Sequence, residues 1–364
     1  MPGFCSGRVD VDMMILAAAA AALVVVLIAR RGTPRARVSP RRQYVGEMGE
    51  ADPAASGVEP MALAMLRQRF HVWALGLAGL PAEEPEPEHH EISSKVMAAL
   101  QRADLSPRYI PRRPQLLPQL IQSVNDSTAS ARSISRIIGS DPVLAVNLLR
   151  IANSPLYRFQ RHEVQSIERA VTLVGNDGIR QIITAALVQP VMNPPDRDGG
   201  HYSRQLWEYT LRMSLAAADH ARSMDNEDGF SAQLAGLLRG LGVAMVVQAT
   251  ADAYSRRQTL PPSPQVLLCL IDSCAAATAA RIAREWELEP AIVQALEAQA
   301  REPAGSGLAR SLQRGELAAS LSMLCDGQVL SVEQAQAQLA LHLPPHVVGW
   351  LWRRVHPQQR EGIA

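Results

Sequence analysis

Residue types that bind metals or attack substrates are present in this chain, but they do not fall in catalytic patterns. A metal site or a nucleophilic centre needs His, Cys, Asp or Glu side chains that converge on one point. No Ser-His-Asp order, no glycine-rich phosphate loop and no CxxC pair is recognisable. The later histidines are scattered, and we interpret them as surface or core residues: His201, His220, His342, His346 and His356. The sequence therefore predicts no cofactor and no metal.

The composition predicts a globular, helical protein. Of 364 residues, 47% are hydrophobic and 20% are charged, which is ordinary for a folded domain. Alanine and leucine dominate and aromatic residues make up 4%, which favours helices over sheets. With 36 basic and 35 acidic residues the formal charge is +1, so the overall charge does not point to nucleic acid as a partner. The four cysteines match no disulfide framework and indicate a reducing compartment: Cys5, Cys269, Cys274 and Cys325.

An uncharged apolar run near the N-terminus, Met13 to Ala29, is just long enough to cross a hydrocarbon core of about 30 Å as a helix. Arginines follow it without an acidic residue: Arg30, Arg31, Arg35, Arg37, Arg41 and Arg42. This charge bias predicts a single-pass anchor in the inner (cytoplasmic) membrane, with the rest of the chain in the cytoplasm. A cleaved signal peptide and a buried helix of a soluble protein are the alternatives. A signal peptide requires a basic start, and here the polarity is reversed.

Between this run and the main domain the pattern predicts a linker and a helical region. Residues 30–57 are rich in Pro, Gly, Ala and Arg without apolar periodicity, which is typical of a flexible linker. From Val58 to Leu80 we expect a helix of about six turns with one apolar face: Leu63, Leu66, Phe70, Trp73 and Leu77. This face is expected to dock on the main domain, to lie on the membrane, or to pair with a second copy in a homodimer. From Pro81 to Glu91 we expect a solvated hinge, and from Ile92 to Arg102 a short helix.

From Leu116 onward the signals predict a compact bundle of amphipathic helices. Asp141 and Pro142 start a helix that ends after Ala152, because Asp caps a helix and Pro fits its first position. Gly175 is expected to end the next helix, and the helix after that to end at Pro190. Short turns between such helices favour an all-α bundle.

Several of these segments resemble a known family. The blocks IIGSDPVLAVNLLRIANSPLYRF and SIERAVTLVGNDGIRQII are similar to the HDOD domain, the HD-related output domain of bacterial signalling proteins. The resemblance covers roughly residues 107–301 and rests on long ungapped blocks. It implies an all-α HDOD bundle whose second half is related to the HD family of metal phosphohydrolases. It also implies a role in signal transduction.

The same resemblance indicates which metal ligands of the HD hydrolases are missing here. Tyr209 stands where such an enzyme has its first His, and the segment GLLRGLG places Arg239 and Gly240 where the family has a His-Asp pair. Ser273 follows Asp272 at a position where the family usually has His. Divalent metals require imidazole and carboxylate donors, and a guanidinium group at the site repels a cation. The sequence therefore predicts a degenerate HD site without catalysis.

The whole chain is thus predicted to divide into successive parts. These are a short N-terminal segment (1–12), a transmembrane helix (13–29), a basic flexible linker (30–57), a helical juxtamembrane region (58–106), the HDOD domain (107–301) and a C-terminal helical extension (302–364). The extension is expected to hold three helices, Leu308 to Leu324, Ser331 to Leu341 and Pro344 to Val355. Of its two tryptophans, Trp350 and Trp352, one is expected to pack and the other to lie near the surface.

Three functions remain open from the sequence. The leading hypothesis is a membrane-tethered, non-enzymatic output or scaffold domain that binds a protein partner in a signalling pathway. A partner surface is expected around Asn153, Pro155 and Tyr157, although this corner also suits a plain turn of the chain. A second hypothesis is a nucleotide sensor in which Arg239 holds a phosphate, unless this arginine pairs with Glu208 or is simply solvated. The third is an active HD-type hydrolase, which requires a metal that the ligand positions do not favour.

Overall fold

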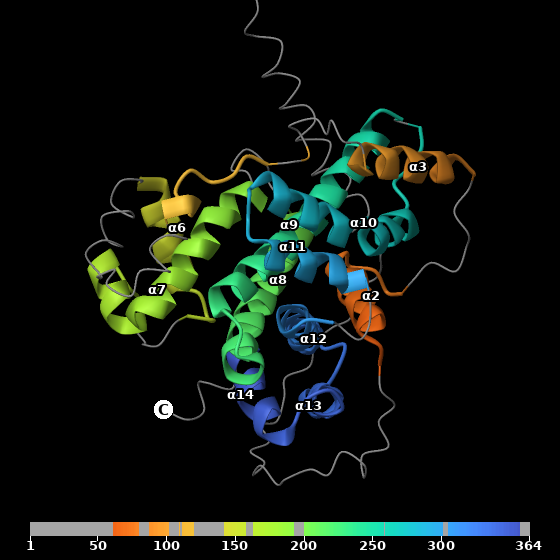
Figure 1. Cartoon of the computed structure of the whole chain (residues 1–364). Helices are drawn as coiled ribbons and strands as arrows, with labels where there is room; N and C mark the ends of the chain where they lie inside the picture. Colours follow the sequence, from red (N-terminus) through yellow and green to blue (C-terminus); the bar gives the residue numbers. More distant parts are fainter. Residues whose placement is uncertain are drawn as a thin grey trace, which may run out of the picture.

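The computed structural model describes residues 61–79, 87–101, 109, 111–119, 142–157, 163–192, 200–257, 259–300 and 305–356. Within these residues every regular element is a helix and none is a strand (Figure 1). The all-α class expected from the sequence is therefore confirmed. The expected transmembrane helix, residues 13–29, and the linker, residues 30–57, lie outside the described residues.

The bundle is built around α8, α9, α10 and α12. The α-helices are α2 (Leu63–Ala74), α3 (Pro87–Gln101), α6 (Pro142–Ala152), α7 (Ile167–Met192), α8 (Gly200–His220), α9 (Gly229–Ser255), α10 (Pro264–Glu285), α11 (Pro290–Glu297), α12 (Gly307–Asp326), α13 (Val332–Ala340) and α14 (Pro345–Val355). α9 packs against both α8 and α10, and α12 packs against α8 (Figure 1). α2 lies against α12, and α3 lies against α9 and α10. Two helices that precede the main domain therefore contact its core.

Glycines allow α9 to lie close to both of its neighbours. A side chain at Gly240 would collide with the Thr210 side chain of α8, and one at Gly242 would collide with the Ala275 backbone of α10. The Asp228 carboxylate caps the start of α9 by accepting hydrogen bonds from two backbone amides at 3.2 and 2.7 Å. α9 is buried around most of its circumference, which is expected of a helix at the centre of a bundle.

Two helices of the described residues, α9 and α10, are long and apolar enough to cross a membrane. Most of each apolar window is buried inside the bundle, 83% for α9 and 67% for α10. Length and hydropathy do not distinguish a membrane span from a core helix. In both cases most of the apolar surface is covered by other helices of the same bundle.

The prediction that Gly175 and Pro190 end helices was wrong. A single helix, α7, runs through both positions from Ile167 to Met192. A glycine costs about 1 kcal/mol in a helix interior, and burial of an apolar face that includes Ile182 and Ile183 offsets this cost. Pro190 lies in the last turn, where the missing amide proton removes only one backbone hydrogen bond.

The N-terminal helices also differ from their predicted limits. α2 ends at Ala74, and Gly76 then adopts a φ of 71°, a left-handed conformation that suits glycine after a helix end. α3 begins earlier than expected, at Pro87, because proline fits the first turn of a helix. His89 in this turn is buried and hydrogen-bonded to the Tyr254 hydroxyl at 2.8 Å. The second half of the expected solvated hinge is therefore helical, and of its residues His89 alone is buried while Pro87, Glu88, His90 and Glu91 are exposed.

The C-terminal extension forms the three helices expected of it and packs on the rest of the bundle. α12 and α14 both contact α8, and α13 contacts α12 and α14. Trp352 is fully buried and stacks on His356 with ring centroids 4.8 Å apart, whereas Trp350 is only partly buried. This difference agrees with the expectation that one tryptophan packs and the other lies near the surface.

Candidate functional site

Three helices of the core bring the expected site residues together around a buried carboxylate. Arg239 on α9 and Tyr209 on α8 both contact Glu316 on α12. The Arg239 Nη2 atom lies 3.4 Å from Glu316 Oε1, and the Tyr209 hydroxyl donates to the same oxygen at 3.3 Å. Arg239 and Glu316 are each 1% exposed. The alternative pairing of Arg239 with Glu208 was wrong, because Glu208 pairs with Arg212 at 3.1 Å.

The helix α2 completes this arrangement from outside the core. The Arg67 Nε atom lies 3.1 Å from Glu316 Oε1, and Arg67 Nη2 donates to Glu316 Oε2 at 3.4 Å. On the outer side, Arg67 Nη1 donates to Asp272 Oδ1 of α10 at 3.0 Å. The Asp272 side chain is 68% exposed and marks the rim of the arrangement. We call the following residues the ion cluster: Arg67, Tyr209, Arg239, Asp272 and Glu316.

Two guanidinium groups share one buried carboxylate in the ion cluster. Burial opposes ionisation of Glu316, but Arg67 and Arg239 together outweigh it and hold the pKa of Glu316 below its ordinary value. Burial lowers the pKa of Arg239, and the attraction of Glu316 offsets this effect only in part. The Nε and Nη1 atoms of Arg239 have no hydrogen-bond partner among the described residues. The buried part of the ion cluster therefore carries excess positive charge, which disfavours a further cation.

Aromatic packing holds α2 over the ion cluster. The Phe70 ring stacks on Tyr209 with centroids 4.1 Å apart and an interplanar angle of 14°. His71 Nδ1 is hydrogen-bonded to the Tyr202 hydroxyl at 3.0 Å. Burial first, and then the cations of the ion cluster, lower the pKa of His71 to about 3, so this imidazole is neutral near pH 7. Of the three arrangements expected for this helix, the structure shows docking on the main bundle.

Gly240, the second residue of the expected ligand pair, serves close helix packing. The Thr210 side chain of α8 lies where a side chain at position 240 would begin. The Thr210 hydroxyl donates to the Leu206 backbone oxygen at 2.6 Å, which holds it in this place. An aspartate at position 240 would therefore meet α8 before it could reach a metal.

The arrangement does not offer the ligands of a divalent metal. In the part of the chain that the structure describes, no group of three or more His, Cys, Asp or Glu side chains could hold a metal ion. The Ser273 hydroxyl donates to the Cys269 backbone oxygen of its own helix at 2.7 Å. His342 and His346 stand four residues apart, but they do not share a helix, since α13 ends before the first and α14 begins between them. The ion cluster thus has two guanidinium groups, those of Arg67 and Arg239, at its centre.

The comparison with protein families identifies the chain. The family model of the HDOD domain matches residues 110–302, which is more than half of the chain. The chain belongs to the HDOD family. Tyr209, Arg239 and Asp272 lie within the matched HDOD domain, whereas Arg67 precedes it and Glu316 follows it. The ion cluster therefore joins the HDOD domain to both of its flanks.

Two solved structures are similar to this chain at low sequence identity. A protein from Shewanella amazonensis SB2B, provisionally named a metal-dependent phosphohydrolase, is 16% identical over 74% of this chain and 98% of its own, with a TM-score of 0.50. An HDOD domain protein of unknown function from Geobacter sulfurreducens is 18% identical over 74% of this chain and 88% of its own, with a TM-score of 0.45. The similarity to the Shewanella amazonensis protein shows a shared fold and nothing more. No curated protein sequence matches this chain significantly.

A pocket of about 580 Å³ opens beside the ion cluster of this HDOD protein, between α2 and α10. Arg67, His71 and Asp272 line it, together with apolar residues such as Met65 and Leu268. The two most deeply buried charges of the ion cluster are not among the lining residues. Arg67 therefore lies between this pocket and the buried carboxylate.

A second polar cluster contains serine, histidine and aspartate, but not in a catalytic arrangement. His220 Nδ1 lies 3.0 Å from Ser311 Oγ and 3.3 Å from Asp225 Oδ2. In a hydrolytic triad the serine and the aspartate bind opposite nitrogens of the imidazole. Here both contact the same nitrogen, and all three side chains are buried. The cluster ties α8 and the π-helical turn η2 (Ala221–Asp225) to α12.

The corner expected to form a partner surface makes several contacts within the chain. The Asn153 amide donates to the Val164 backbone oxygen at 2.9 Å, and its Oδ1 accepts from the Val164 amide at 2.7 Å. Tyr157 is buried, and the Arg354 guanidinium lies 5.6 Å from the centroid of its ring. Pro155 is the exposed member of the three. Tyr157 therefore offers no accessible surface to a partner, which corrects this part of the prediction.

Sequence reasoning missed Glu316 and Arg67 as members of the site. Both lie outside the domain limits expected from the resemblance. A signal was present in the sequence: Glu316 interrupts an otherwise apolar stripe of α12, and Arg239 is the first charged residue of α9. Isolated charges on buried helix faces require partners of opposite charge. The pattern could therefore have indicated that the two helices meet through these residues.

Proposed function

We propose that this HDOD protein is a non-catalytic, membrane-tethered signalling domain that acts as an output or scaffold by binding a protein partner. The observation that supports this most is the ion cluster. The positions at which HD hydrolases hold a metal carry Tyr209, Arg239 and Gly240, and Arg67 of α2 covers them. Guanidinium groups repel divalent cations and cannot replace imidazole or carboxylate ligands. Such a centre is suited to holding helices together.

The proposal also assigns to α2 a role in transmitting signals from the membrane to the bundle. Residues 13–29 are taken as an anchor in the inner membrane, with the helical bundle in the cytoplasm. α2 follows this segment along the chain and contacts α8, α10 and α12. A pull on α2, or its release, would therefore disturb three core helices at once. We infer that α2 carries events at the membrane to the bundle.

A nucleotide sensor that uses Arg239 receives less support. The Arg239 side chain is buried, contacts Glu316 and lies under α2. A phosphate would have to displace α2 and compete with a carboxylate already in place. An active HD hydrolase would in addition need new ligands at positions 209, 239 and 240.

The first experiment measures metal content and phosphodiester hydrolysis of the full chain purified in detergent. Mn²⁺ or Fe²⁺ is added, and bis(p-nitrophenyl) phosphate serves as the substrate. We expect the full chain to bind well below one metal ion per molecule. It should hydrolyse the substrate no faster than the Arg239→Ala variant does. Stoichiometric metal together with turnover would contradict the proposal and restore the hydrolase.

A second experiment tests the tether and the partner. Membranes that contain the full chain are extracted with carbonate beside membranes that contain a variant without residues 13–29, and only the full chain should stay with the lipid. Chemical cross-linking in these membranes then compares the wild type with Arg67→Ala. A defined protein adduct that changes in Arg67→Ala supports coupling through α2. The scaffold role is contradicted if neither the wild type nor Arg67→Ala gives a cross-linked protein adduct.

A further inference from the structure

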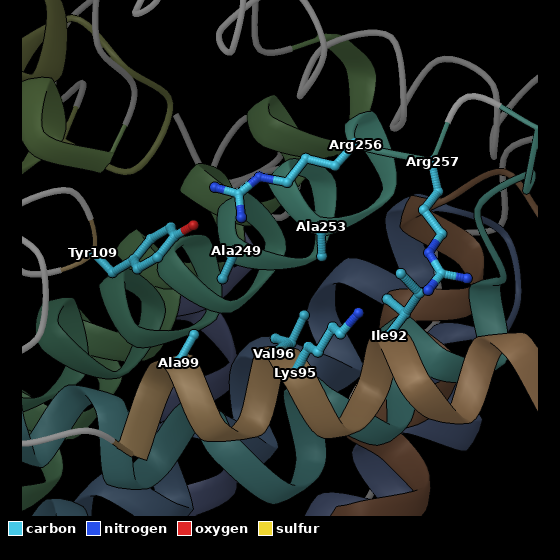
Figure 2. Close-up of a pocket in the computed structure, with 9 residues that line it drawn as sticks. All are labelled: Ile92, Lys95, Val96, Ala99, Tyr109, Ala249, Ala253, Arg256 and Arg257. Carbon is cyan, nitrogen blue, oxygen red and sulfur yellow. The ribbon is translucent and has the colours of Figure 1, made fainter.

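A pocket between α3 and α9 combines basic side chains with an apolar floor (Figure 2). Its volume is about 390 Å³, within the range of roughly 300 to 1,000 Å³ that is usual for small-molecule sites. It lies apart from the ion cluster and shares no lining residue with it. The floor and one end of the pocket are formed by these residues: Ile92, Val96, Ala99, Tyr109, Ala249 and Ala253.

Three basic side chains surround the pocket, those of Lys95, Arg256 and Arg257, and no acidic residue lines it. Figure 2 shows Arg256 extending towards Tyr109, while Arg257 lies at the opposite end. Glu91, which is outside the lining, accepts hydrogen bonds from Lys95 and Arg257 at 2.6 Å each. The lining therefore carries three positive charges and no negative one, which favours the binding of anions.

Arg256 is the basic residue of this group that is available to a ligand. It is exposed at the C-terminal end of α9, and the described residues place no acidic side chain against it. The guanidinium group presents a planar fork of donors that matches the oxygens of a phosphate. Lys95 and Arg257 can add further donors, since their shared partner Glu91 is itself half-exposed.

The floor of the pocket suits a flat, apolar group. Ala99, Ala249 and Ala253 present only methyl groups to the pocket, between the longer side chains of Lys95 and Arg256 (Figure 2). The Tyr109 ring lies at one end, and its hydroxyl donates to the buried Asp252 carboxylate at 3.0 Å. This hydrogen bond holds the ring in place. Aromatic rings of this kind stack readily on nucleobases.

We propose that this pocket binds a nucleoside phosphate, with the base on the alanine floor against Tyr109 and the phosphate at Arg256, Lys95 and Arg257. A planar apolar body joined to an anionic head is the ligand class that fits both halves of the pocket. The ligand contacts α3 and α9 together and fixes their relative position. The proposal does not rest on the proposed signalling function, because the two sites share no residue.

Equilibrium binding of N-methylanthraniloyl-ADP and N-methylanthraniloyl-GDP to the full chain in detergent tests this assignment. We expect saturable binding of at least one of the two probes, with competition by the unlabelled nucleotide. The nucleoside without phosphate and inorganic phosphate alone should each compete about tenfold more weakly, because each occupies only half of the pocket. Inorganic phosphate that competes as well as the nucleotide would overturn the assignment.

Variants locate the ligand in the pocket. Arg256→Ala and Lys95→Ala should each raise the Kd by about fivefold or more, and both side chains are exposed, so the fold is kept. Tyr109→Ala should weaken binding more than Tyr109→Phe, because phenylalanine keeps the ring. Arg353→Ala on α14 removes an exposed arginine elsewhere and should leave the Kd unchanged. No saturable binding at millimolar nucleotide, or an unchanged Kd in Arg256→Ala, would overturn the proposal.

Discussion

Arg67 and Glu316 lie 249 positions apart in the chain, yet the Arg67 Nε atom lies 3.1 Å from Glu316 Oε1 inside the bundle. The pair joins a helix that precedes the matched HDOD domain to one that follows it. A complete buried ion pair adds little net stability, because desolvation offsets the attraction between the charges. Removal of one partner is costly, because the other charge is left buried. The effect of a substitution in the ion cluster therefore depends on which charge is lost.

Glu316→Gln should destabilise the protein strongly. It removes the buried carboxylate that two guanidinium groups share and leaves both cations without it. We expect the free energy of unfolding in urea to fall by about 3–5 kcal/mol. Glu285→Gln, at an exposed position near the end of α10, is the control and should change it by less than about 0.5 kcal/mol. Similar free energies of unfolding for the two variants would show that the ion cluster does not contribute to stability.

Arg239→Met should cost much less than Glu316→Gln. Glu316 keeps Arg67 as a partner, and the desolvated Arg239 nitrogens without hydrogen bonds are removed. Methionine fills a similar length with apolar atoms. We expect urea denaturation to give a free energy within about 1.5 kcal/mol of the wild type. A loss as large as that of Glu316→Gln would identify Arg239, and not Arg67, as the main counter-charge.

Gly240→Ala should destabilise the protein although alanine is the better helix former. The new methyl group would collide with Thr210, so α8 and α9 would have to move apart. We expect a loss of about 1–3 kcal/mol, measured by thermal or urea unfolding. Gly305→Ala is the matched control, since a methyl group there meets nothing within 4 Å. Close packing at position 240 is refuted if the two variants unfold alike.

The stability of the fold should decrease as the pH falls below about 6.5. The pKa of His71 is about 3 in the folded protein, below the ordinary 6.5, so the unfolded chain binds a proton first. Stabilisation that is present above pH 6.5 is therefore lost between about pH 6.5 and 3, at up to about 1.4 kcal/mol per pH unit. His220 and His356, whose pKa values burial also lowers, add to this slope. Glu316, with a lowered pKa, adds a further loss at more acid pH.

The His71→Gln variant separates this residue from the other histidines. Urea denaturation of the wild type and the variant at several pH values between 7.5 and 5 gives the two slopes. The variant should show the smaller dependence, lower by up to one proton taken up on unfolding. Parallel curves would mean that His71 titrates normally and is not buried between α2 and the bundle.

The centre of the site could be predicted from the sequence, because Tyr209, Arg239 and Gly240 stand in segments that resemble a family with other residues there. Their partners could not be predicted in this way. Arg67 and Glu316 reach the centre from helices far apart in the sequence, and a pattern within one helix does not say which other helix it meets. The all-α class followed from composition and apolar spacing, which are local properties.

Helix ends were harder to predict than helix faces. Gly175 and Pro190 are signals of a helix end, but burial on the bundle kept α7 continuous through them. Pro87 starts α3 within a segment whose prolines and acids are typical of a solvated hinge. In each case the tertiary contacts outweighed the local preference. The placement of Tyr157 inside the bundle has the same origin, since a tyrosine in a turn does not reveal what covers it.

The matched HDOD domain, residues 110–302, leaves out two residues of the ion cluster, Arg67 and Glu316. A fragment cut at these limits would keep Arg239 inside its core and lose both Glu316 and Arg67. The remaining guanidinium would then be enclosed without an anion, a state that costs several kcal/mol. We therefore expect the smallest independent folding unit of this chain to include both α2 and α12, so that the boundary of sequence similarity is not a boundary of stability.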